Sequence, residues 1–194
     1  MAGYTSTAWW TNPIKQLDKS TEVISADRIY LIEFAPNQFP IEYIDLVVSW
    51  LNDKETMKYS EQGNIVHSST SQILYLLSEF PARINSFNRY WFIVCRDKER
   101  DMPDKLIGTL TTRHIHLSEE VDIGILLGDK NERGHGYAIE AMSAVINNYS
   151  QLGIKRFTIG TMLKNRPMIN LAKALGMKKY KKDDFHLYME MRTS

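Results

Sequence analysis

The stretch VDIGILLGDKNERGHGYAIEAMSA, from Val121 to Ala144, changes its periodicity in the middle. Up to Leu127, apolar side chains alternate with Asp122 and Gly124, which is the pattern of a strand with one buried face. From Ala138 onward, the apolar side chains return every third or fourth position, as they do on one face of a helix. The stretch therefore predicts a strand, a turn and a helix.

The turn RGHGYA, from Arg133 to Ala138, has two glycines directly before the predicted helix. Glycine lacks the Cβ atom that would keep a ligand away from the backbone, and the N–H groups of a helix N-terminus favour an anion. We therefore predict a phosphate-binding loop, although Gly134 and Gly136 could equally form a tight turn and nothing more. The predicted binding residues are Arg133, Gly134, His135, Gly136, Tyr137 and Ala138.

The same turn carries a family resemblance. Arg133, Gly136 and Ala138 occupy the fixed positions of (Q/R)xxGx(G/A), the acyl-CoA signature of the GNAT superfamily of N-acyltransferases. Further along, NRPMINLAKALGM, from Asn165 to Met177, is similar to the segment that closes the family's domain. The chain thus resembles GNAT enzymes, and in particular their ribosomal-protein and amino-sugar acetyltransferase branch.

The resemblance implies an α/β (α+β) fold of the GNAT type. Such a fold has a mixed, mostly antiparallel central sheet of six to seven strands, about four flanking helices, and strands splayed at the CoA site. We predict an N-terminal extension over residues 1–26, which includes Trp9 and Trp10, and a GNAT domain over residues 27–194. Periodicity and turn residues place strands at 28–34, 90–96, 105–116, 121–127, 154–162, 178–182 and 185–191, and helices at 41–51, from Ser69, from 138 and at 165–175.

Charge and cysteine content narrow the class of protein. The 24 basic and 23 acidic residues nearly cancel, whereas nucleic-acid or membrane-surface binding normally requires a basic excess on one face. We therefore expect neither partner. The single cysteine, Cys95, lies in the apolar run YWFIVC, which favours a buried thiol over a nucleophile. Because neither a membrane-span pattern nor a signal-peptide pattern is seen, we expect a cytoplasmic protein.

The resemblance implies acetyl-CoA as the cosubstrate, with no metal. The pantetheine arm is expected to pair with the strand like an added strand, while the pyrophosphate meets the N–H groups of the 133–138 loop. A β-bulge near residues 124–127 is expected to turn one N–H toward the thioester oxygen. An asparagine before the last helix is expected to bind the pantetheine or a water, or to cap its own helix. The cofactor residues added in this way are Ile125, Leu126, Leu127 and Asn165.

Asp122 is the predicted general base. Many family members have a glutamate early in this strand, and counting back from Gly136 without gaps places Asp122 at that position. A carboxylate could take a proton from an ammonium group of pKa about 10, directly or through water. A structural role for Asp122 is an equal alternative. Weaker candidates are Glu61, Glu119 and Glu120.

The position where the family usually has its general acid differs in this chain. Many members have a tyrosine seven residues after the helix-starting asparagine, and here that position is Ala172. Either another group or water must protonate the leaving thiolate, or protonation is undemanding because a thiolate leaves readily. Neither Tyr180 nor Tyr188 can be assigned this role from the sequence.

The acceptor is expected to be a small-molecule amine. In the family, the segment between the first two helices lines the acceptor side, which makes Tyr59 and Glu61 the substrate candidates, with a solvated loop as the alternative. The segment WLNDKETMKYSEQ resembles enzymes that modify nucleotide-linked amino sugars, so an amino sugar is favoured over a protein N-terminus. A catalytically degenerate acyl-CoA-binding module and a homodimer both stay open. His114 and His116 share one strand face, but nothing fixes further ligands beside them, and we expect no metal.

Overall fold

The computed structural model describes residues 22–34, 41–60, 69–78, 88–96, 104–114 and 119–193. The predictions made for Trp9, Trp10, Glu61 and His116 lie outside these residues.

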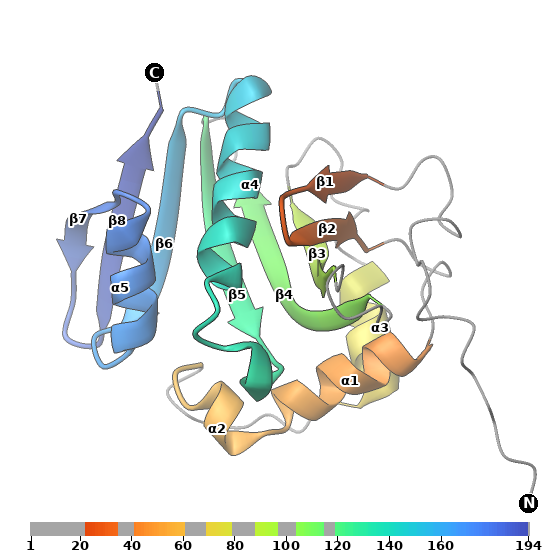
Figure 1. The fold of residues 1–194 in the computed structure, drawn as a ribbon. Coiled ribbons are helices and arrows are strands. Elements are labelled where there is room, and N and C mark those ends of the chain that lie inside the picture. The colour runs from red at the N-terminus through yellow and green to blue at the C-terminus, as the bar shows by residue number, and fades with distance from the viewer. Residues whose placement is uncertain are drawn as a thin grey trace, which may run out of the picture.

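One sheet of eight strands runs through the molecule (Figure 1). Its order is β1-β2-β3-β4-β5-β6-β8-β7, and each neighbouring pair is antiparallel except β5 and β6, which are parallel. The mixed, mostly antiparallel sheet is thus confirmed. The strands are β1 (Val23–Ser25), β2 (Ile29–Glu33), β3 (Arg89–Cys95), β4 (Lys105–His114), β5 (Glu120–Leu127), β6 (Arg156–Met162), β7 (Lys178–Lys182) and β8 (His186–Arg192).

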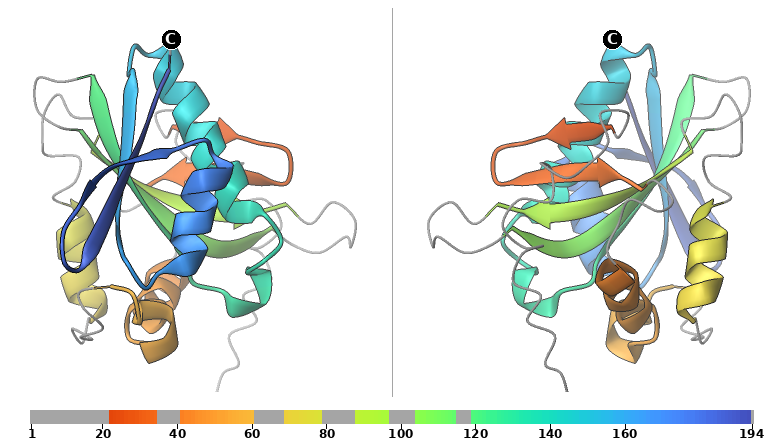
Figure 2. Two further views of the ribbon diagram at one scale, coloured as in Figure 1. Left: turned by 90° about the vertical axis from the view of Figure 1, so that its left-hand side faces the viewer. Right: turned by 90° about the vertical axis from the view of Figure 1, so that its right-hand side faces the viewer.

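Helices cover both faces of this sheet (Figure 2). The α4 and α5 helices lie on one face, and α3 lies on the other, with α1 and α2 at the end where β5 finishes. The described helices are α1 (Ile41–Leu51), α2 (Lys54–Met57), α3 (Thr70–Ser78), α4 (Tyr137–Gln151) and α5 (Arg166–Ala174), and a 3-10 turn, η3, spans Lys130–Glu132.

The structure adds two elements to the six to seven strands and four helices that were expected. The strand β1 lies within the segment assigned to the N-terminal extension, and it pairs with β2 from Val23 to Ser25, so the sheet begins before residue 27. Only three residues long, β1 is too short to show a periodicity. The four-residue helix α2 escaped prediction for the same reason, since it is little more than a turn that starts with Asp53 accepting from the Thr56 N–H.

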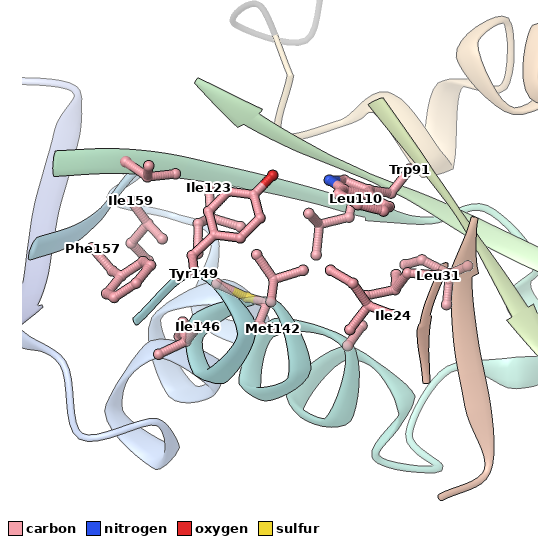
Figure 3. Close-up of a cluster of buried hydrophobic side chains, with 14 of the residues drawn as sticks. Ile24, Leu31, Trp91, Leu110, Ile123, Met142, Ile146, Tyr149, Phe157 and Ile159 are labelled. Atoms are coloured by element: carbon pink, nitrogen blue, oxygen red, sulfur yellow. The ribbon is translucent and has the colours of Figure 1, made fainter. Parts of the chain in front are cut away.

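The larger core lies between α4 and the sheet (Figure 3). Met142, Val145 and Tyr149 of α4 are almost fully buried, and they face side chains from both halves of the sheet. The Tyr149 hydroxyl lies 3.1 Å from Thr112 Oγ1 on β4, so its polar end is satisfied inside the core. This packing fixes the axis of α4 and therefore the position of its N-terminus. The facing residues are Ile24, Leu31, Trp91, Leu110, Ile123, Phe157 and Ile159.

The second core lies between α1 and the other face of β2, β3 and β4. Ile44, Val47 and Trp50 of α1 are buried there, spaced so that they share one face of the helix. Trp50 packs so closely on Gly128 that a Cβ added to the glycine would lie 1.8 Å from the indole Cδ2. The end of β5 is thereby held against α1.

Helix capping follows the sequence closely. Ser69 and Gln72 form a capping box at the start of α3, because the Ser69 N–H donates to Gln72 Oε1 at 2.9 Å and the Gln72 N–H donates to Ser69 Oγ at 3.3 Å. Asn165 caps α5 by accepting from the Met168 N–H at 3.2 Å. No helix in the part of the chain that the structure describes has the length and apolar content needed to cross a membrane.

Candidate acetyl-CoA site

The strands β5 and β6 part midway along the sheet. Their parallel pairing covers Glu120 to Asp122 on β5 and ends there. Beyond that point β5 stays paired with β4 as far as Leu127, while β6 stays paired with β8 as far as Met162. The splayed strands expected from the resemblance are therefore present, and they expose one edge of β5 after Asp122.

The exposed edge presents backbone groups of alternate residues. The Gly128 N–H donates to the Ile107 carbonyl at 3.1 Å, so Gly128 and Ile107 form a hydrogen-bonded pair of the β4–β5 ladder. Since such pairs alternate along an antiparallel ladder, the N–H and C=O groups of Ile123, Ile125 and Leu127 point away from β4. Leu127 O accepts from Arg133 Nε at 3.0 Å, whereas Ile125 faces the side that β6 has left. An extended ligand could pair with Ile125 as an added strand does.

The β-bulge expected near residues 124–127 lies directly after them, at Gly128 and Asp129. The register of β5 against β4 runs without a shift from Val121 to Leu127. Beyond Leu127, the Gly128 and Asp129 N–H groups both donate to the Ile107 carbonyl at 3.1 Å, so two residues oppose one residue of β4, as they do in a β-bulge. The divergence comes from β6 turning away with β8, so no inserted residue is needed to direct the Ile125 N–H into the opening.

The predicted phosphate loop forms the N-terminus of α4. Gly134 and Gly136 have φ angles of 84° and 85°, a left-handed conformation that favours glycine. Gly136 is the N-cap residue and offers no side chain to the free N–H groups of the first helical turn. A Cβ added to Gly134 would meet no atom within 4 Å, so this side of the loop is open. The residues therefore fit a pyrophosphate, which would accept from these N–H groups with the helix dipole behind them.

The segment that leads into the loop is braced by β4 and α2. Lys105 Nζ of β4 lies 2.6 Å from Asp129 Oδ2 and 3.0 Å from Glu132 Oε1. From α2, Thr56 Oγ1 accepts from Arg133 Nη2 at 2.9 Å. Lys130 Nζ reaches the carboxylate of Asp53 as well. The Arg133 side chain is therefore turned toward Leu127 and Thr56.

Asp122 lies on the face of β5 opposite α4. Its neighbours Val121 and Ile123 are buried in the larger core, beneath α4. Strand alternation places Asp122 on the other face of β5, where Leu126 packs against the second core. Burial raises the pKa of the Asp122 carboxyl above its ordinary value, against the lowering effect of Arg113. The residue therefore sits where the strands part, in surroundings that make its carboxylate more basic.

A polar network that the sequence did not predict lies beside Asp122. Arg156 of β6 forms ion pairs with Glu120 of β5 and, at 2.6 Å, with Glu190 of β8. The Tyr180 ring of β7 stacks on the Arg156 guanidinium, 4.9 Å from ring centroid to Cζ. Burial and the negative charges of Glu120 and Asp122 raise the pKa of Tyr180. Four different strands supply these groups, so no local spacing could have revealed them.

The remaining predicted residues are placed as follows. Tyr59 follows α2, half-buried, with its ring 5.1 Å from Lys58 Nζ. Ala172 is fully buried in the α4 core. Cys95 is buried and unoxidised at the end of β3. Within the described ranges, no three His, Cys, Asp or Glu side chains gather where they could hold a metal ion.

Comparison with protein families agrees with this geometry. The family model described as an acetyltransferase (GNAT) domain matches residues 37–178. The chain belongs to the GNAT family. It is accordingly an acetyl-CoA-dependent N-acetyltransferase, with acetyl-CoA as cosubstrate. A search of curated proteins found no match.

Solved structures share the GNAT fold of the chain at low sequence identity. RimL, a ribosomal L7/L12 α-N-protein acetyltransferase solved with CoA, superposes with a TM-score of 0.70 at 14% identity, over 88% of this chain and 98% of that one. Spermidine N-acetyltransferase from Vibrio cholerae, solved with CoA and spermine, gives a TM-score of 0.68 at 12% identity, over 85% and 95%. The microcin C7 self-immunity acetyltransferase MccE, solved with acetyl-CoA and AMP, gives 0.66 at 17%, over 86% and 93%.

Proposed function

We propose that this GNAT enzyme acetylates a primary amine by direct attack on acetyl-CoA within a ternary complex. The observation that carries the proposal is the combination of parted strands with a side-chain-poor helix N-terminus at the end of the same strand. The strand supplies backbone groups for the pantetheine amides, and the helix supplies N–H groups for the pyrophosphate. Both ends of one extended cofactor are thus provided for by the segment between residues 123 and 138.

The chemistry needs a neutral amine and a stabilised oxyanion. In our proposal, Asp122 takes a proton from the ammonium form of the acceptor, directly or through water, and frees its lone pair. The amine nitrogen then bonds to the thioester carbon, and the carbonyl oxygen becomes an oxyanion that a backbone N–H at the opening between the strands can stabilise. Collapse of this intermediate breaks the carbon–sulfur bond and releases the CoA thiolate, which takes up a proton, while the acetylated nitrogen loses its second proton.

For the acceptor, we propose an amino sugar, in nucleotide-linked form. The proposal rests on the resemblance of the α1–α2 segment to enzymes that modify nucleotide-linked amino sugars. Contacts of this segment with Lys130 and Arg133 hold it beside the cofactor loop. A protein N-terminus is the second candidate, favoured by the likeness to RimL over nearly its whole length. For the acceptor side we propose Tyr59 and Glu61, and for the pantetheine Asn165.

The alternative of an acyl-CoA-binding module without turnover is motivated by Ala172, because alanine stands where many family members have a tyrosine that could act as the acid. Thiol release separates the two functions. The purified protein is expected to release free CoA from acetyl-CoA in the presence of at least one amine in a panel of nucleotide-linked amino sugars, peptides with free N-termini and polyamines. Tight binding of acetyl-CoA without thiol release by any of these amines would favour the binding module.

A further inference from the structure

Arg28, in the turn between β1 and β2, contacts the phosphate loop and the first turn of α4. Its Nη1 donates to the His135 carbonyl at 2.8 Å, and its Nε donates to Glu140 Oε2 at 2.9 Å. Its backbone N–H donates to the other oxygen, Glu140 Oε1, at 2.6 Å. The guanidinium also lies over the Tyr137 ring, with Cζ 4.8 Å from the ring centroid. One side chain thus joins the first strands of the sheet to the start of α4.

These contacts engage both oxygens of Glu140. Glu140 lies in the first turn of α4, where a carboxylate interacts favourably with the helix dipole. The same position would place its negative charge close to a bound pyrophosphate, and like charges at short range oppose binding. Arg28 compensates this charge, with Nη2 2.8 Å from Glu140 Oε2 and only 15% of the glutamate side chain exposed.

The hydrogen bond from Arg28 to the His135 carbonyl also sets the orientation of the peptide group that joins His135 to Gly136. In a trans peptide the C=O and N–H groups point in opposite directions, so a carbonyl directed at Arg28 turns the Gly136 N–H away from Arg28. Arg28 lies close behind the glycine, because a Cβ on Gly136 would be 3.2 Å from Nη2. The guanidinium therefore supports the loop from the side opposite that N–H.

We propose that Arg28 is a positioning residue for CoA, which fixes the Gly136 N–H for the pyrophosphate and withholds the charge of Glu140 from it. The inference rests on the proposed CoA site. Arg28 acts on the phosphate half of the cofactor only, since its side-chain contacts among the described residues lie in the loop and the first turn of α4. No contact joins it to the open edge of β5 in the described residues.

The variant Arg28→Met tests whether Arg28 affects binding of the phosphate half of CoA and leaves binding of the pantetheine half unchanged. It removes the guanidinium and keeps the backbone N–H bond to Glu140, so the turn stays anchored and the protein should fold. We expect the Kd for CoA to rise about tenfold, because the uncompensated charge of Glu140 then opposes the pyrophosphate. The Kd for pantetheine, which lacks the pyrophosphate and the nucleotide, should stay the same in ligand-observed NMR. The matched control is Arg89→Met, which breaks the 2.6 Å ion pair with Glu33 far from the loop and should change neither Kd.

A second variant isolates the charge of Glu140. Glu140→Gln should bind CoA at least as tightly as the wild type, and Arg28→Met combined with Glu140→Gln should regain part of the affinity lost by Arg28→Met. Equal loss for CoA and pantetheine, an equal effect of Arg89→Met, or no recovery in the double variant would overturn the inference. If the wild-type protein itself fails to bind CoA, the proposed function fails instead, so the two outcomes are distinguishable.

Discussion

Replacing Gly136 with valine is expected to raise the Kd for CoA about a hundredfold, because backbone strain and loss of the N–H direction act together. At a φ of 85° a β-branched residue is strained, so the peptide must rotate and carry its N–H away from the phosphate. The added side chain also meets the Arg28 guanidinium, which lies 3.2 Å from the Cβ position. Calorimetry with CoA measures the effect.

Gly153→Val is the matched control for strain alone. Gly153 has a φ of 93° and no atom within 4 Å of a Cβ, and it lies beyond the other end of α4. Both variants should lose roughly 1–3 kcal/mol of unfolding free energy from strain. Only Gly136→Val should lose CoA affinity, and normal CoA binding by Gly136→Val would show that the loop is merely a turn.

Asp122→Asn is expected to lower kcat/KM for the acceptor about a hundredfold or more, the usual effect of removing a general base. The amide keeps the shape of the carboxylate but accepts no proton, so the acid limb of the pH–rate profile that Asp122 sets should disappear. The limb set by the ammonium group of the acceptor should remain. Glu119→Gln serves as control, because Glu119 is exposed and paired only with Lys155 at 2.9 Å among the ion pairs given by the structure. An unchanged pH profile in Asp122→Asn would exclude Asp122 as the base.

The raised pKa of Asp122 also makes the free energy of unfolding depend on pH. Since burial raises the pKa above its ordinary value of 3.8, the folded protein holds this proton more tightly than the unfolded chain. The free energy of unfolding contributed by Asp122 is therefore fully present below pH 3.8 and decreases as the pH rises through the folded pKa. Asp122→Asn lacks this decrease, so its Tm should exceed that of the wild type at pH 7 while its activity falls.

The central strand, turn and helix could be predicted because their signals are local. Alternation marks β5, a helical stripe marks α4, and the two glycines of the loop take the positive φ angles that suit glycine. The capping residue Asn165 was predictable for the same reason. Each of these features depends on residues within a few positions of one another.

The features that were missed or mistaken depend on tertiary structure. Arg28 and Glu140 are 112 positions apart and meet only because α4 packs across the β1–β2 hairpin. The network of Arg156 with Tyr180 needs the strand order β6-β8-β7, which no local pattern reveals. The exact place of the bulge depends on the pairing of Gly128 and Asp129 with Ile107 of another strand, so the resemblance indicated only its neighbourhood. Sequence patterns thus indicated the cofactor loop but not the residues that support it.

The most direct test of the account is amide hydrogen exchange of the wild-type protein with and without CoA. Bound CoA should slow exchange at the Ile125 amide and at the amides of residues 134–138, since the proposed hydrogen bonds shield those groups from solvent. Exchange in the β7–β8 hairpin should stay the same. Saturating CoA that leaves the amides of Ile125 and of the loop unprotected would contradict the claim that the cofactor lies along the parted strand with its phosphates at α4.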